Sequence, residues 1–248
     1  LKIPTRPLCE ALRARCPSLF SSEDISLQEA MECLERASAT KSMTERAEWI
    51  TEAMNGLLSS AAGLSLPTLL SIFNGLDRLH FQDCTLRLGL AYCEAKQLSS
   101  QDSLHLVHDR MMESLASCGF IQERTVSSQL GIDEMRNRWL SMAVNSQNEG
   151  FLMALYGWLL TNRFIGTLLD LPSVASLQSF LLTDFPCAEL PRRDLLWKWL
   201  VKRERFAEAA GVLYQLAACV QLPLCLSERI EYLSLAMTNN SSSPGGQA

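Results

Sequence analysis

Helical spacing of apolar residues runs through nearly the whole sequence, and this feature constrains the fold most. After Ser22, whose hydroxyl suits a helix start, apolar residues recur every three to four positions. The same spacing follows Ser42-x-x-Glu45, a capping box in which two side chains satisfy free backbone amides. Ser65 and Pro67 open another helix. Because alternating runs of β-branched residues are absent from the sequence, we predict an all-α fold without a sheet. Further helices are predicted at 80–96, 102–118, 132–145, 149–161, 164–170, 193–203, 206–220 and 226–237.

A repeat of about 40 residues connects these helices. The segment from Trp158 to Phe164 is echoed from Trp199 to Phe206: in each, a helix runs into a polar turn that contains Arg-Phe, and a second apolar helix follows. Phe164 and Phe206 are 42 positions apart, and Phe81 lies 83 positions before Phe164. Two helices in such a period are typical of HEAT-like solenoids. The pattern therefore predicts a right-handed stack of antiparallel helix hairpins, an α-solenoid, with a compact helical domain as the alternative.

Composition divides the chain into one helical body and a tail. We predict a continuous solenoid segment over residues 1–237, with a looser connection near 119–131, where Gly, Ser and Thr gather. Residues 238–248 are mostly Asn, Ser, Pro and Gly and have little to bury, so we predict a disordered tail or linker. Leu1 stands where a complete chain has methionine, so we expect a fragment of a longer protein.

Charge, hydropathy and cysteine usage argue against several classes of function. A net charge of −5 disfavours direct nucleic-acid binding, which draws on Lys and Arg. No stretch approaches the roughly 18 to 20 apolar residues of a membrane span, and the N-terminus lacks the apolar core of a signal peptide. The nine cysteines form an odd set among mainly apolar residues, as free thiols do in a reducing compartment. We therefore expect the cytosol or the nucleus.

One segment departs from the acidic balance. Positions 192–205 hold six basic residues against two acidic ones, although the whole chain has 22 Lys and Arg against 27 Asp and Glu. A solvated helix face explains such a run, and contact with an acidic partner surface is the alternative. We hypothesise that the last two hairpins, residues 194–236, bind a partner. The candidate partner-binding residues are Lys198, Lys202, Arg203, Tyr214 and Tyr232.

Sequence patterns for catalysis and for cofactors are missing. The chain has no Gly-rich phosphate loop, no Gly-x-Ser-x-Gly elbow and no Cys-x-x-Cys pair. His80 with Cys84, and His105 with His108, have the spacing of zinc ligands on helices, but core thiols and surface histidines are the better explanation. Cys118 with His108 is conceivable as a nucleophile and base, yet nothing in the sequence lowers the pKa of the thiol. We expect no enzyme, catalytic residue, metal, cofactor or small-molecule ligand, with an all-α Cys/His enzyme as an alternative.

Five stretches in a fixed order carry a family resemblance, from about position 10 to 237. They are Cys16–Asp24, Ala154–Leu159, Asp194–Trp197, Phe206–Ala217 and Leu226–Ala236. Together they resemble the C-terminal helical region of the large inner-ring scaffold nucleoporins, the 155/170 class. Each stretch alone is weak, because small and apolar residues at helical spacing are common, but five in order are specific. Residues 98–137 match this family poorly.

The resemblance implies a slice of a long helical solenoid in the scaffold of the nuclear pore complex, at the nuclear envelope. In that family the solenoid helps to build the inner ring and docks segments of linker nucleoporins, including the Gly-Leu-Phe-Gly-repeat type. Such a scaffold supports nucleocytoplasmic transport of protein and mRNA. Membrane contact belongs to the family's propeller, so none is expected from this segment. Grooves between stacked helices would accept amphipathic or extended segments. A vesicle-coat subunit built as a helical solenoid is the main alternative.

Overall fold

The structure is a computed structural model, and it describes residues 22–96, 101–117, 129–172, 175–183, 190–220 and 222–242, with positions 11 and 15. These residues form helices and the turns between them, and no strand occurs among them, so the all-α prediction is confirmed. The chain divides into two compact units, Leu1–Asn148 and Glu149–Ala248. No helix in these ranges combines the length and apolar character that crossing a membrane requires. One continuous solenoid over 1–237 stays a prediction.

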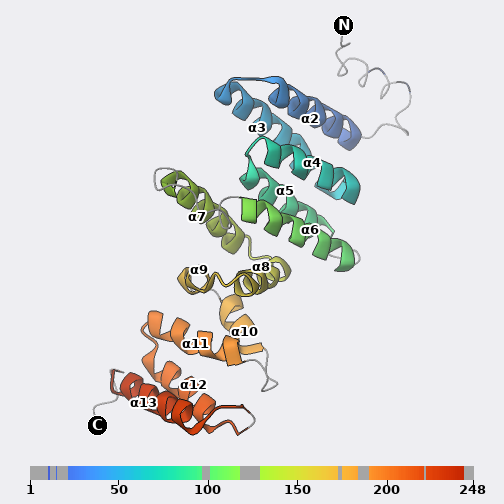
Figure 1. The fold of residues 1–248 in the computed structure, drawn as a ribbon. Helices are drawn as coiled ribbons and strands as arrows, with labels where there is room; N and C mark the ends of the chain where they lie inside the picture. Colours follow the sequence, from blue (N-terminus) through green and yellow to red (C-terminus); the bar gives the residue numbers. More distant parts are fainter. Residues whose placement is uncertain are drawn as a thin grey trace. The chain divides into compact units, whose positions relative to one another are not determined.

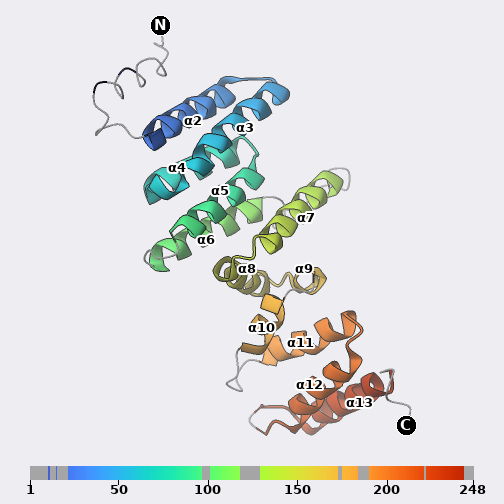
Figure 2. The same cartoon turned by 180° about the vertical axis from the view of Figure 1, so that it is seen from behind.

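The first unit is built from helices that pair in hairpins. They are α2 (Ser22–Ala39), α3 (Met43–Ser59), α4 (Leu66–Arg78), α5 (Gln82–Ala95), α6 (Gln101–Leu115) and α7 (Gln129–Asn145), with a 3-10 turn, η1 (Ala61–Gly63), after α3. Along one side of this unit α3 contacts α5 and α5 contacts α7, while α4 and α6 pack together on the other side of α5 (Figures 1 and 2). Helix α5 is therefore the centre of the unit.

The caps and close contacts of the first unit follow from its sequence. Ser42 Oγ accepts the backbone N–H of Glu45 at 3.5 Å, as the capping box predicts, and Ser65 caps α4 in the same way. Between α2 and α3 the backbones approach closely at Gly56, where a Cβ atom would lie 2.9 Å from the Ser26 carbonyl oxygen. Glycine is thus required there by space, since its lack of a side chain allows the approach.

A carboxylate on α4 joins three helices of the first unit. The Asp77 side chain accepts hydrogen bonds from Thr85 on α5 (3.0 Å) and from Ser114 on α6 (2.6 Å). Arg110 on α6 donates to the second carboxylate oxygen at 2.6 Å. Thr85 and Ser114 are buried, so this network satisfies polar groups that would otherwise be costly in the interior.

The second unit continues the hairpin pattern. Its helices are α8 (Glu149–Thr161), α9 (Ile165–Asp170), α10 (Ala175–Thr183), α11 (Leu190–Lys202), α12 (Phe206–Ala218) and α13 (Leu226–Ser242). Helix α10, which the sequence analysis did not predict, packs between α8 and α11, and α12 packs against both α11 and α13. Helix α13 extends five residues beyond the predicted end at 237. Asn239 is buried in that extension and bonds to the Leu235 carbonyl at 2.8 Å.

The polar turn of the sequence repeat contains a residue in the left-handed conformation. These residues are His80, Arg163 and Glu204, with φ of 64°, 62° and 58°. In each turn the next residue donates its N–H to the carbonyl five positions earlier, which is the Schellman motif of a helix end. The bonds run from Phe81 to Leu76, from Phe164 to Leu159 and from Arg205 to Leu200, at 2.9 to 3.0 Å. Arg205, rather than Phe206, is therefore the equivalent of Phe164, and the repeat between these turns is 41 residues.

Candidate functional site

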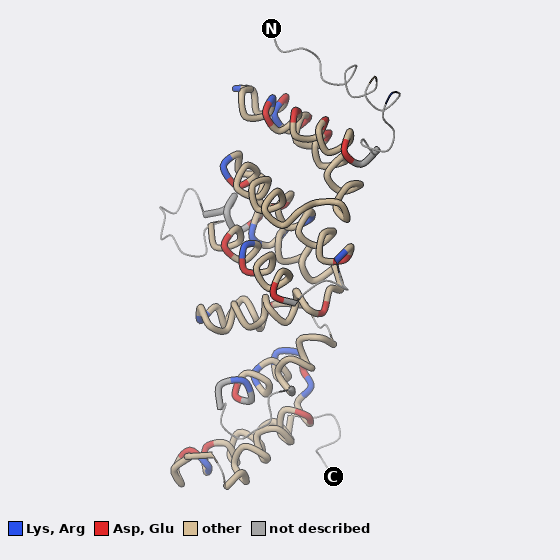
Figure 3. Tube along the Cα trace, turned by 90° about the vertical axis from the view of Figure 1, so that its right-hand side faces the viewer, with Lys and Arg blue, Asp and Glu red and all other residues tan. Residues whose placement is uncertain are grey.

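The basic run on α11 makes its contacts within the second unit, and Figure 3 shows the Lys and Arg positions along this helix. Lys198 Nζ lies 2.5 Å from Asp194 Oδ2, one turn earlier. Lys202 pairs with Asp170 at the end of α9, and Arg203 donates to the backbone carbonyl of the next residue, Leu171. Lys202 and Arg203 therefore connect α11 to the end of α9, whereas Lys198 pairs within α11.

Asp194 also accepts hydrogen bonds from two aromatic side chains. Trp197 Nε1–H donates to it at 2.8 Å, and the Tyr232 hydroxyl on α13 does so at 3.4 Å. Tyr232 is partly buried, and burial followed by the charge of Asp194 raises the pKa of its phenol. Trp199 is fully buried, while Trp197 packs partly buried against α12 and α13. The surface that α11 buries is accordingly wide.

The five predicted partner-binding residues do not share one surface role. Lys198 and Tyr232 share the Asp194 carboxylate, and Lys202 and Arg203 contact the end of α9. Tyr214 on α12 is different, because its side chain is 62% exposed. Partner binding by these residues stays a prediction.

Arg229 on α13 is a residue whose role the sequence did not indicate. Its guanidinium donates to four backbone carbonyls at the end of α12 and in the turn to α13. These belong to Ala217 (2.6 Å), Cys219 (2.9 Å), Leu222 (3.1 Å) and Leu224 (3.3 Å). The planar fork of arginine suits donation to several acceptors, so this side chain fixes the α12–α13 turn.

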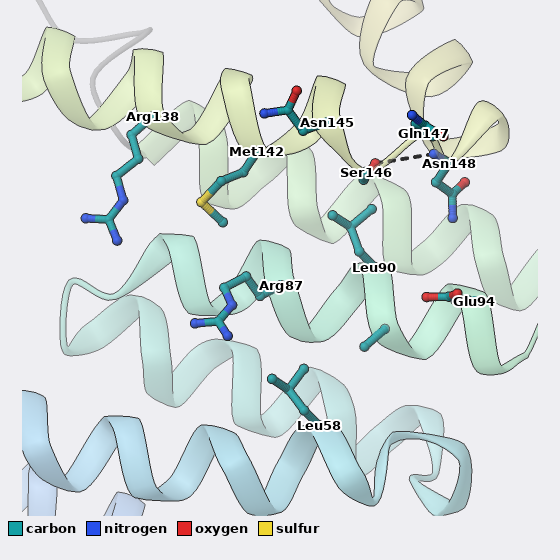
Figure 4. A pocket seen from close by; sticks show the side chains of 11 residues that line it. Leu58, Arg87, Leu90, Glu94, Arg138, Met142, Asn145, Ser146, Gln147 and Asn148 are labelled. Atoms are coloured by element: carbon teal, nitrogen blue, oxygen red, sulfur yellow. Dashed lines mark hydrogen bonds between the residues drawn. The ribbon is translucent and has the colours of Figure 1, made fainter.

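The first unit carries two adjoining hollows over α5, and we call them together the α5 groove. One, of about 760 Å³, lies between α5, the end of α3 and the C-terminal half of α7 (Figure 4). The other, of about 590 Å³, lies between the N-terminal half of α5, α3 and α7. Both are lined by Arg87 and Arg138, so they meet at these two side chains.

The two arginines of the α5 groove differ in their pairing. Arg138 Nη2 lies 3.1 Å from Asp83 Oδ2, but 71% of the Arg138 side chain is exposed, so this ion pair is weak. No carboxylate in the described ranges forms an ion pair with Arg87. Figure 4 shows Arg87 and Arg138 at one end of the larger hollow and Glu94 toward the other. Apolar side chains of α3, α5 and α7 lie between these charges.

The smaller hollow contains a buried acceptor without a partner. Gln82, in the first turn of α5, is only 5% exposed, and its Oε1 atom has no hydrogen-bond partner. A buried acceptor in this state costs roughly 1–3 kcal/mol relative to a satisfied one. An N–H group that reached this oxygen would remove that cost. Sequence reasoning missed Gln82, because a glutamine at a helix start is usually exposed.

The residues considered for zinc or nucleophilic chemistry lie in different settings. Cys84 is buried, and burial, followed by the charge of Asp83, raises the pKa of its thiol to about 12. Metal ligation and nucleophilic attack need the thiolate, which such a pKa disfavours. His108 is buried on α6 beside His105, and burial lowers its pKa. Cys118 lies outside the described residues. Within the described ranges no three His, Cys, Asp or Glu side chains gather as a metal site.

Comparison with solved structures extends the fold assignment. The Nup170 SOL structure of Chaetomium thermophilum matches with a TM-score of 0.75 and 22% identity, over 98% of this chain and 34% of that one. The complex of the Chaetomium thermophilum Nup170 CTD with Nup145N matches with a TM-score of 0.70 and 21% identity, over 91% of this chain and 47% of that one. At these identities the matches show a shared helical fold.

Comparison with known sequences and with a family profile gives the family. "Probable nucleoporin C890.06" of Schizosaccharomyces pombe is 29% identical over 246 residues, which cover 92% of this chain and 18% of that protein. Nucleoporin NUP170 of Saccharomyces cerevisiae is 28% identical over 258 residues, covering 91% and 17%. The chain thus spans less than a fifth of the length of these relatives. A family profile, described as "Non-repetitive/WGA-negative nucleoporin C-terminal", matches residues 5–248. This chain belongs to that nucleoporin C-terminal family.

Proposed function

We propose that this chain is a structural segment of the nuclear pore scaffold, located in the inner ring at the nuclear envelope. Its role there is to bind neighbouring and linker nucleoporins and so to support nucleocytoplasmic transport. The family match over residues 5–248 carries the proposal. The complex of a Nup170 C-terminal domain with Nup145N supports it, because that relative of the same fold binds another nucleoporin.

Binding takes place in grooves between helices and requires no chemistry by the scaffold. An extended or amphipathic segment of a linker nucleoporin, including the Gly-Leu-Phe-Gly-repeat type, lays apolar anchors into such a groove while polar groups at the rim fix its register. The α5 groove has this composition, with apolar side chains between charged ends. The exposed Tyr214 offers an aromatic anchor in the second unit.

A capture experiment tests the proposal. The purified chain is immobilised and incubated with nuclear-envelope extract, and the bound proteins are identified by mass spectrometry. Enrichment of inner-ring and linker nucleoporins over an unrelated acidic helical protein of similar size is expected. Capture of clathrin or secretory-coat subunits instead, or of no pore protein, would overturn the proposal.

The α11–α13 surface needs variants that separate binding from folding. Tyr214→Ala removes an exposed side chain and should leave the fold intact, whereas reversal of Lys202 or Arg203 also breaks contacts with the end of α9. Tyr232→Phe deletes only the hydroxyl that donates to Asp194. If Tyr214→Ala and Lys198→Glu leave every captured nucleoporin unchanged, this surface does not bind partners.

A further inference from the structure

Three features of the α5 groove point to one kind of occupant. A cation without an ion-pair partner among the described residues, Arg87, stands where the two hollows meet. Glu94 stands further along α5, and Leu58, Leu90 and Met142 line the space between them (Figure 4). The smaller hollow adds the buried, unpartnered acceptor of Gln82. Charged side chains, apolar lining residues and an unsatisfied hydrogen-bond acceptor therefore lie along the same groove.

Resting on the function proposed above, we infer that the α5 groove binds an extended segment of a partner nucleoporin. In this segment an acidic residue is followed, four positions later, by a basic residue, with an apolar residue midway between them, so that all three side chains share one face of the extended chain. The acidic side chain pairs with Arg87, the apolar one fills the larger hollow, and the basic one reaches Glu94.

The spacing of the motif comes from the geometry of α5. Arg87 and Glu94 are seven residues apart, and a helix rises 1.5 Å per residue, so the two charges are separated by roughly 10 Å along its axis. Side chains on one face of an extended chain are two or four positions apart, which is about 7 or 13 Å at about 3.3 Å per residue. Four positions leave the middle one for the apolar side chain, and the long Arg87 and Glu94 side chains cover the remaining difference. The polarity of the segment is fixed as well, because an acidic group at Glu94 or a basic group at Arg87 would meet its own sign.

An extended segment fits better than a helix because of the hydrogen bonds that the groove offers. The backbone N–H groups of a helix are used internally, whereas those of an extended chain are free to donate. Gln82 Oε1 needs such a donor. At the other end the side-chain amides of Asn145 and Gln147, both exposed, line the larger hollow and can pair with main-chain groups.

The test uses the whole chain and a library of random 12-residue peptides displayed on phage. Selection on the immobilised chain should enrich peptides with the acidic, apolar, basic order, and their affinities are then measured by fluorescence anisotropy. Arg87→Glu should weaken the selected peptides about ten-fold, since a charge-assisted contact becomes repulsive. Exchanging the acidic residue of the peptide for lysine should restore binding to this variant and weaken binding to the wild type. Gln82→Met, which removes the acceptor at similar volume, should weaken binding several-fold.

Arg78→Glu is the matched control, because Arg78 is an exposed arginine on α4 that lines neither hollow. This variant should bind the selected peptides as the wild type does. Selection without the charge order, or peptides that bind Arg87→Glu and the wild type equally, would overturn the inference. The capture from nuclear-envelope extract, repeated with Arg87→Glu, separates the two proposals. Equal capture of nucleoporins by both baits refutes the groove alone, and capture of none by the wild type refutes the scaffold function.

Discussion

The basic run of α11 and the α5 groove both present Lys or Arg side chains, but they use them differently. In the second unit Lys198, Lys202 and Arg203 each bond to a carboxylate or carbonyl of the same unit. In the first unit Arg87 has no such partner in the described ranges, and Gln82 keeps a buried acceptor unsatisfied. A cluster of charge in a sequence is therefore a poor guide to binding, since the fold decides which charges remain available.

The largest expected effect tests whether the polar groups of the first unit that lie outside the α5 groove are paired within the unit. On the α4–α6 side of α5, Asp77 satisfies Thr85, Ser114 and Arg110. Asp77→Ala should lower the free energy of unfolding of this unit by about 3 kcal/mol, because buried polar partners lose their acceptor. Urea unfolding, with hydrogen exchange of α4–α6 as the local probe, measures the change. In Asp83→Ala, which breaks a more exposed ion pair, the loss should stay below about 1 kcal/mol.

The second effect compares the two regions directly through charge reversal. Arg203→Glu removes a hydrogen bond to the Leu171 carbonyl and places a negative group beside it, so the second unit should lose about 2 kcal/mol. Arg87→Glu in the groove should change stability by less than about 0.5 kcal/mol, because Arg87 is exposed and forms no ion pair with the described residues. Thermal and urea unfolding of the two variants check this contrast. Equal losses would mean that Arg87 also has a structural role.

The helices and the family could be predicted from the sequence, because both depend on local residue order. The Ser42 and Ser65 caps are where their hydroxyls predict them. The register of the repeat turn could not be predicted from the sequence. Its left-handed position is occupied by His80, Arg163 and Glu204 and not by glycine, the residue that usually marks such turns. The predicted repeat was consequently displaced by one residue in the last turn.

The α5 groove could not be predicted because its walls come from distant segments. Leu58, Arg87 and Met142 line one hollow from three different helices. Helix α10 was missed for a local reason, since its nine residues include no acidic residue in the first turn and no basic residue in the last. The predicted residues on α11 were selected by charge alone, and a sequence does not show that Asp170 or Leu171 will satisfy them.

A smaller effect concerns the α3 wall of the groove. Gly56 lets α3 approach α2, and a Cβ atom there would lie 2.9 Å from the Ser26 carbonyl oxygen and 3.2 Å from the Ala30 Cβ. Gly56→Ala should destabilise the first unit by about 1–2 kcal/mol, because the helices must separate. Gly75→Ala, with nothing within 4 Å of the added atom, should instead stabilise it by up to about 1 kcal/mol. Thermal midpoints of the two variants would show opposite shifts; shifts of the same sign would contradict the close approach of α2 and α3.

The smallest expected effect is a difference between the two units in how their stability depends on pH. All three histidines lie in the first unit, and burial of His108 on α6, with His105 nearby, lowers its pKa from the ordinary value of 6.5. The unfolded chain therefore binds more protons below that value, so stability is present above about pH 6.5 and is lost as the pH falls through it. Between pH 7.5 and 5.5, hydrogen exchange in α4–α6 should accelerate relative to α11–α13, after correction for the intrinsic exchange rates. His108→Asn should flatten this dependence, whatever its effect at pH 7.5. An unchanged slope in this variant would assign the acid sensitivity to another group of the first unit.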